Sequence, residues 1–126
     1  MTSDFDQELA DYLRLAILSG HKTQTQGRDR FVCLAAITAM QCGLIAMANQ
    51  LHQFVKTSQP HHWWSACEEM QAVMIHERFP SQQLQLRKFC SRERAELLVE
   101  QQGMPREEAT REQLEELVQE VIGLST

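Results

Sequence analysis

The feature that most constrains this 126-residue chain is the stretch from Phe31 to Val55, which contains no Asp, Glu, Lys or Arg. Its first part, residues 31–48, is almost entirely apolar and rich in Ala, Leu and Met, which favour a helix over a strand. A helix of this composition has no solvated face, so other helices must surround it. The stretch predicts a long apolar central helix at about residues 29–57.

Small residues recur every fourth position within this stretch, at Ala35, Ala39 and Gly43. They predict a narrow stripe on which another helix can approach closely. Membrane helix pairs use the same spacing, and eighteen mostly apolar residues are near the minimum for crossing a bilayer. The abundance of Ala, Gln41 in the middle of the run and the lack of an aromatic belt favour the interior of a soluble bundle instead.

Apolar residues at helical spacing predict further helices on both sides of the central one. Ser91 is suited to capping one of them, and Thr110 with Gln113 forms a capping-box pattern at the start of the last. The expected segments are 4–19, 61–79, 81–90, 92–102 and a last helix beginning at 110. The fold class is therefore predicted as all-α: one domain, residues 1–126, with five to six helices bundled around residues 29–57.

Charge and cysteine content narrow the class of protein. The net charge is −5 and the pI is about 5.5, which disfavours a protein held to nucleic acid by overall charge. No CxxC pair and no secretory signal are apparent, so we expect a cytoplasmic protein with reduced thiols in its core. The cysteines are Cys33, Cys42, Cys67 and Cys90.

Potential metal ligands cluster in the middle of the chain, without the spacing that a metal site on a helix requires. The cluster contains no ExxH or HxxxH pair, so we predict no metal-binding residue and no cofactor. The residues concerned are His52, His61, His62, Cys67 and His76.

Motifs for catalysis are similarly missing from the sequence. It has no phosphate-binding Gly-rich loop, no nucleophile elbow and no HExxH, so we predict no catalytic residue and do not expect an enzyme. A metal-dependent or thiol enzyme, with Cys67 as the thiol to test, is kept as a second alternative.

Two features predict surfaces for a protein partner. Trp63 and Trp64 are adjacent and would point about 100° apart on a helix; Trp63 fits the apolar stripe, so Trp64 is the candidate for a partner contact. The last helix carries a long regular stripe that includes Leu114, Leu117 and Val121, which we also assign to partner binding.

A basic segment suggests a different function. Seventeen residues contain five basic side chains and one acid, Glu93; the basic residues are Arg78, Arg87, Lys88, Arg92 and Arg94. They could follow a phosphate backbone, which makes a small nucleic-acid-associated subunit the first alternative function. Packing of this segment against the acidic last helix is the favoured explanation of its charge.

The function expected from the sequence is a non-catalytic helical protein–protein interaction module, such as an adaptor, an assembly factor or a small subunit of a complex. The partner is another protein or a second copy of the chain, and a homodimer is the simplest way to cover the central run. A membrane partner is not expected.

Overall fold

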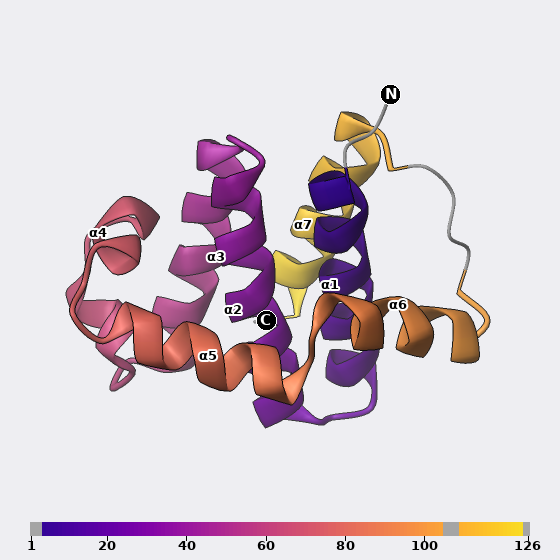
Figure 1. Cartoon of the computed structure of the whole chain (residues 1–126), viewed down its shortest axis with the longest axis horizontal. Helices are drawn as coiled ribbons and strands as arrows, with labels where there is room; N and C mark the ends of the chain where they lie inside the picture. The colour runs from indigo at the N-terminus through magenta and orange to yellow at the C-terminus, as the bar shows by residue number, and fades with distance from the viewer. Residues whose placement is uncertain (1–3, 105–108, 125–126) are drawn as a thin grey trace.

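The computed structural model describes residues 4–104 and 109–124, and every regular element in this part of the chain is helical (Figure 1). This confirms the predicted all-α class. In chain order the elements are α1 (Asp4–His21), α2 (Thr25–Gln41), α3 (Ile45–Ser58), the 3-10 helix η1 (Trp63–Ala66), α4 (Met70–Met74), α5 (Phe79–Phe89), α6 (Arg92–Gln101) and α7 (Arg111–Gly123).

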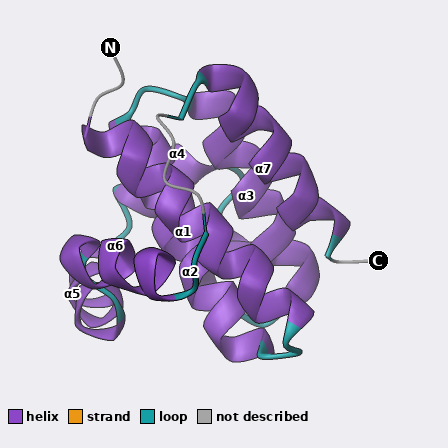
Figure 2. Ribbon diagram, turned by 90° about the vertical axis from the view of Figure 1, so that its right-hand side faces the viewer, coloured by secondary structure: helices purple, strands orange, loops and turns teal. Residues whose placement is uncertain are grey.

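Four helices form the body of the molecule. α1 packs along α2, α2 along α3, and α7 against both α1 and α3. The short α4 lies against α2 and α3, and α6 lies across α1. α5 is not among the closely packed helix pairs; it runs with α6 along one side of the body (Figures 1 and 2).

The buried side chains form one continuous core around α2. Every residue from 31 to 39 is buried, so the prediction that other helices wrap this run is confirmed for its first part. The cover comes from within a single chain, including Leu9 and Leu13 on α1 and Leu51 on α3. A second copy is therefore not needed to keep water from residues 31–39, which removes the reason given above for a homodimer.

The predicted long central helix at residues 29–57 is wrong, because the chain turns at residues 42–44 and continues as α3. The turn is a Schellman motif, in which Gly43 N–H donates to the Met40 carbonyl and Leu44 N–H donates to the Ala39 carbonyl. Gly43 has φ +76°, a left-handed conformation that glycine adopts without steric cost. Its role is to end α2, and it does not belong to a close-packing stripe.

The helix predicted at residues 61–79 is also wrong, since η1, an extended link and the short α4 occupy these positions. Cys67 and Glu69 have extended backbone angles, and the Met70 N–H donates to Oδ1 of Asn49 on α3 at 2.8 Å. A side chain from another helix therefore satisfies the first turn of α4, a tertiary contact that local periodicity does not encode.

α6 and α7 begin at the positions predicted from their capping residues, Ser91 and Thr110. Ser91 Oγ accepts from the Arg94 N–H, and Thr110 forms a complete capping box with Gln113. α7 runs beside α1 with the carboxyl ends of both together, where a Cβ added at Gly20 would lie 2.7 Å from Cδ1 of Leu124.

Three of the four cysteines are buried and Cys42 is partly exposed; all four are free thiols. Among the described helices, none combines the length and the apolar character that crossing a bilayer requires.

Candidate functional site

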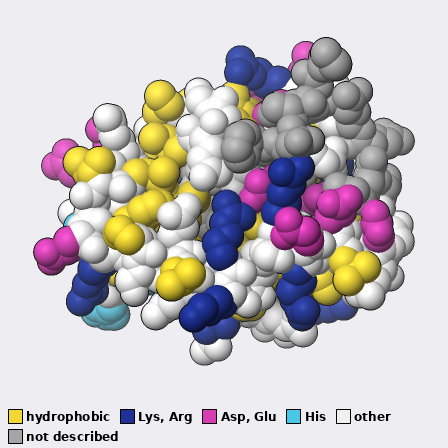
Figure 3. Space-filling view, viewed as in Figure 1, with side chains coloured by type: hydrophobic (Ala, Val, Ile, Leu, Met, Phe, Trp, Pro, Cys, Tyr) yellow, Lys and Arg dark blue, Asp and Glu magenta, His cyan; other side chains and the backbone are white. Residues whose placement is uncertain are grey.

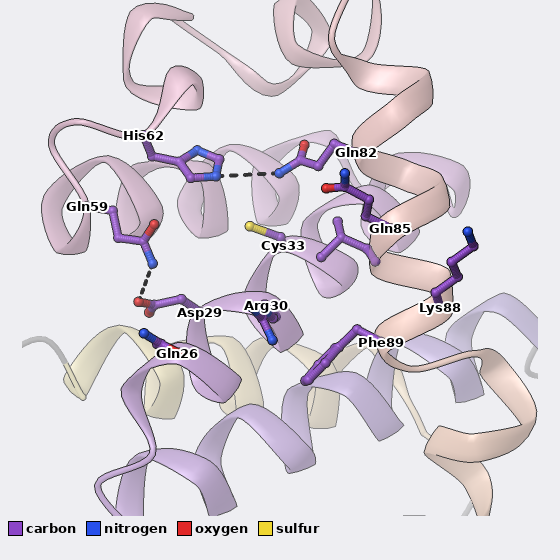
Figure 4. A pocket seen from close by; sticks show the side chains of 11 residues that line it. Gln26, Asp29, Arg30, Cys33, Gln59, His62, Gln82, Gln85, Lys88 and Phe89 are labelled. Atoms are coloured by element: carbon purple, nitrogen blue, oxygen red, sulfur yellow. Dashed lines mark hydrogen bonds between the residues drawn. The ribbon is translucent and has the colours of Figure 1, made fainter.

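A polar cleft lies between α2 and α5 and is closed at one end by the chain that leaves α3 (Figure 4). Its volume is about 760 Å³, within the range of roughly 300–1,000 Å³ that ligand pockets usually occupy. The residues that line it define the polar cleft: Gln26, Asp29, Arg30, Cys33, Gln59, His62, Gln82, Gln85, Leu86, Lys88 and Phe89.

Helical spacing places these residues on two facing walls. On α2 the lining residues follow one another at intervals of three, one and three positions, and on α5 the intervals are three, one, two and one. Each set therefore covers one face of its helix. The α2 wall is Gln26, Asp29, Arg30 and Cys33, and the α5 wall is Gln82, Gln85, Leu86, Lys88 and Phe89.

Asp29 is a buried carboxylate whose charge is compensated within the chain. The Arg28 guanidinium donates to Asp29 Oδ1 from Nε at 3.0 Å and from Nη2 at 2.9 Å, and the Gln59 amide donates to Oδ2. Arg28 also lies over the Phe54 ring at 5.2 Å from the ring centroid. These contacts fix the start of α2 to the end of α3 and leave Asp29 little capacity for a ligand.

Trp64 anchors η1 through three hydrogen bonds and is fully buried. Its indole Nε1 donates to Gln82 Oε1 at 2.7 Å, its backbone N–H donates to His62 Nδ1 at 3.1 Å, and its carbonyl accepts from His52 Nε2 at 2.8 Å. The prediction that Trp64 is a partner contact is thus contradicted by its burial. Trp63 is the partly exposed member of the pair, because residues 63–66 are not part of a long α-helix.

His62 keeps one N–H without a suitable acceptor inside the cleft. Nδ1 accepts from Trp64, so the neutral ring carries its proton on Nε2. That atom faces the Gln82 amide nitrogen at 3.5 Å, which is itself a donor because Gln82 Oε1 accepts from Trp64. Burial lowers the pKa of His62, and the nearby Asp29 offsets this only in part. The ring therefore stays neutral and offers its N–H to the cleft.

The other end of the cleft is cationic. Arg30 and Lys88 are exposed on opposite walls, and the Arg30 guanidinium lies over the Phe89 ring at 5.1 Å from the ring centroid. Phe89 in turn packs against Phe31, with ring centroids 5.1 Å apart. Asp29 is the acidic residue in the lining, and Arg28 balances it, so the uncompensated charge of the cleft is positive.

Cys33 lies in the α2 wall as a buried thiol. Desolvation by burial raises its pKa far above the ordinary range of a thiol, and Asp29 adds to this effect. The protonated thiol is a poor nucleophile.

The predicted basic segment is divided between surface and interior. Arg78, Lys88 and Arg94 are exposed and Arg92 is partly exposed, whereas Arg87 forms an ion pair with the buried Glu8 of α1. Arg87 therefore joins the segment to α1, and packing of the other basic residues against the acidic last helix stays a prediction. Nucleic-acid binding by the remaining residues stays a prediction.

The stripe on α7 is covered by the chain itself. Leu114 and Val121 are buried and Leu117 is partly buried, because α7 packs against α1 and α3. Leu114 and Val121 are thus unavailable to a partner in this fold. In the described part of the chain, no group of three or more His, Cys, Asp or Glu side chains is placed to hold a metal ion.

The polar cleft was not predicted from the sequence, although its two walls carry a signal. Polar residues at helical spacing occur at residues 26–33 and at 82–89. Such patterns are common on solvated helix faces, and only the tertiary structure shows that these two face each other. Comparison with family models, with curated proteins and with solved structures finds no match to this chain.

Proposed function

We propose that this protein is a non-catalytic helical interaction module and that its polar cleft binds a segment of a partner protein. The observation that carries the proposal is the set of four glutamine amides in the lining, at Gln26, Gln59, Gln82 and Gln85. A carboxamide offers the same donor and acceptor groups as a peptide bond, so such a lining suits polypeptide backbone.

The amides differ in their availability. Gln59 and Gln82 are held by Asp29 and Trp64, whereas Gln26 and Gln85 are exposed and make no hydrogen bond to another residue drawn in Figure 4. The first pair shapes the cleft, and the second pair is free to bond to an incoming segment. Fixed walls with free polar groups favour binding because little ordering is needed on association.

The chemistry of the cleft favours binding over bond-making. Cys33 is held as a thiol, His62 is held neutral with its Nδ1 occupied, and both oxygens of Asp29 already accept hydrogen bonds. A thiol or hydrolytic mechanism needs a nucleophile and a general base within reach of each other.

Exposed apolar side chains outside the cleft support contact with a protein. Ile75 is 82% exposed in the turn before α5, and Leu84 is 60% exposed on α5 itself. Figure 3 shows hydrophobic side chains gathered on the side of the molecule where α4 and α5 lie. Leu84 lies on the face of α5 opposite the cleft wall, so a partner that buries this surface must extend beyond the cleft.

Site-specific photo-crosslinking tests the proposal. A photo-reactive amino acid at Gln85 is expected to form an adduct with one defined protein in cells that express this chain naturally. The same group at Gln101, exposed on α6 outside the cleft, should not form it. Replacement of Gln26, on the opposite wall, by a bulky Trp should abolish the adduct, with circular dichroism confirming the fold. Equal labelling from Gln85 and Gln101 would contradict the proposal.

A further inference from the structure

The charge of the polar cleft is opposite to that of the whole molecule. The chain has a net charge of −5, yet the two uncompensated charges in the lining, Arg30 and Lys88, are positive. Figure 4 shows the Lys88 side chain on the far side of α5, pointing away from Arg30, so Arg30 is the cation that lies inside the cleft. Asp29 does not cancel the charge of Arg30, because the Arg28 guanidinium already pairs with the Asp29 carboxylate at 2.9 Å. A ligand at this end of the cleft therefore meets the Arg30 guanidinium.

Arg30 is held in a defined orientation. Its guanidinium lies over Phe89, and a stacked guanidinium keeps the N–H groups along its edge free for a planar acceptor. A carboxylate can accept two parallel hydrogen bonds from such an edge. Lys88 lies next to Phe89 in the chain, but its side chain points away from Arg30.

We propose that the partner segment carries an Asp or Glu side chain whose carboxylate binds the Arg30 guanidinium, while the adjoining backbone bonds to His62 and the glutamine amides. This inference rests on the proposed function and adds the chemistry of the ligand. The His62 N–H supplies a donor for a backbone carbonyl, and Gln26 and Gln85 supply both donors and acceptors.

A protein segment fits the cleft better than a nucleic acid does. Single-stranded nucleic acids bind by stacking bases on aromatic side chains and by neutralising several phosphates. The lining contains one hydrophobic aromatic side chain, Phe89, and Arg30 and Phe31 already pack against it. Arg87, the nearest further cation on α5, is paired with Glu8. The free groups of the cleft match one carboxylate and a peptide backbone.

Selection from a random peptide library displayed on phage tests this inference with the intact protein. Peptides that bind the wild type are expected to share an Asp or Glu at one position, and the Arg30→Gln variant should lose that preference. The Arg94→Gln variant, which removes an exposed charge from α6 outside the cleft, should keep it. Selected peptides without an acidic preference would overturn this inference while leaving the proposed function intact. Failure to select any peptide would overturn both.

A synthetic copy of one selected peptide, acetylated and amidated at its ends, then gives the size of the effect by calorimetry. Replacing its acidic residue by Gln, or using Arg30→Gln protein, should weaken binding by about tenfold or more, as expected for losing a charge-assisted hydrogen bond. A version with Gln in place of the acid and a free C-terminal carboxylate tests the other source of this group, and restored affinity would overturn the assignment to a side chain. The assignment would also be overturned if an oligonucleotide bound the protein and Arg30→Gln weakened that binding more than it weakened binding of the peptide.

Discussion

Glu8 on α1 is a buried carboxylate, and Arg87 from α5 supplies its counter-charge. Arg87 also donates to the Tyr12 hydroxyl at 3.0 Å, and that hydroxyl donates to the Cys90 carbonyl at 3.1 Å. Desolvation by burial raises the pKa of Tyr12 above its ordinary value even though Arg87 opposes the shift, so the hydroxyl remains a donor. This network joins α5 to the body of the molecule at the cationic end of the cleft.

Removal of Arg87 alone should be costly, because it leaves the Glu8 carboxylate buried without a partner. We expect Arg87→Met to lower the free energy of unfolding by about 2–4 kcal/mol, less than for a fully enclosed pair because the Arg87 side chain is 29% exposed. The double variant Glu8→Leu/Arg87→Met should be more stable than Arg87→Met in urea unfolding. A double variant that loses the sum of both single effects would contradict this account.

His52 links stability to pH. Burial lowers its pKa below the ordinary 6.5, Lys56 lowers it further, and the hydrogen bond to the Trp64 carbonyl opposes the shift. Between the lowered pKa and 6.5 the unfolded chain binds more protons than the folded chain, so the free energy of unfolding falls as the pH drops through this range. Urea titrations from about pH 7.5 to 5.5 should show a smaller fall for His52→Gln. The same slope in the wild type and in His52→Gln would be inconsistent with this role for His52.

The two tryptophans show why residue roles were hard to predict. On an assumed helix Trp63 was assigned to the buried face and Trp64 to the surface. The helix is absent at these positions, and Trp64 is the buried residue instead. Trp64 became an internal residue because Gln82 and His52, eighteen positions later and twelve earlier, satisfy its polar groups. No local pattern around residues 63–64 contains that information.

At the scale of elements, amphipathic helices and caps were predictable, whereas turns inside apolar sequence were not. Thr110 and Ser91 cap as expected, since a cap is a local interaction. The break between α2 and α3 depends on Gly43. Because apolar residues flank Gly43 on both sides, the sequence there resembles the interior of a single helix. α2 is largely buried and α3 buries one face, and both lie within the uncharged run, so composition alone cannot distinguish one long helix from two antiparallel ones.

A pair of glycine variants tests that turn. Gly43→Ala should lower the free energy of unfolding by about 1–2 kcal/mol, because alanine is strained in the left-handed conformation. Space is not the cause, as nothing lies within 4 Å of a Cβ at this position. Gly123→Ala, at an equally open position within α7, should be neutral or stabilising by up to about 1 kcal/mol. Equal effects of the two substitutions in thermal or urea unfolding would argue against the Schellman turn.

At the scale of the whole molecule, the class and the buried core followed from the uncharged run, while the site did not. The run folds into most of α2 and α3, which pack on each other, and α1 and α7 add cover from within the chain. The polar cleft arises because α5 stands apart from α2 and is joined to it by side chains such as Phe89. That separation is a property of the assembled fold, and two polar helix faces in the sequence do not reveal it.

The negative net charge and the ion pair of Arg87 with Glu8 predict that the protein does not bind nucleic acid. Fluorescence anisotropy with a labelled DNA duplex should detect no binding at low salt, because the net charge of −5 is repulsive and Arg87 is paired with Glu8. Affinity at low salt that falls steeply as salt is added would instead favour the nucleic-acid function.

The most direct test of the central claim is a ¹H–¹⁵N spectrum of the labelled protein as the crosslinked partner, or a selected peptide, is added. The side-chain amide signals of Gln26 and Gln85 should shift, together with the ring N–H of His62, while those of Gln101 on α6 should not. Shifts confined to residues outside the polar cleft, with the cleft amides unchanged at saturation, would contradict the account.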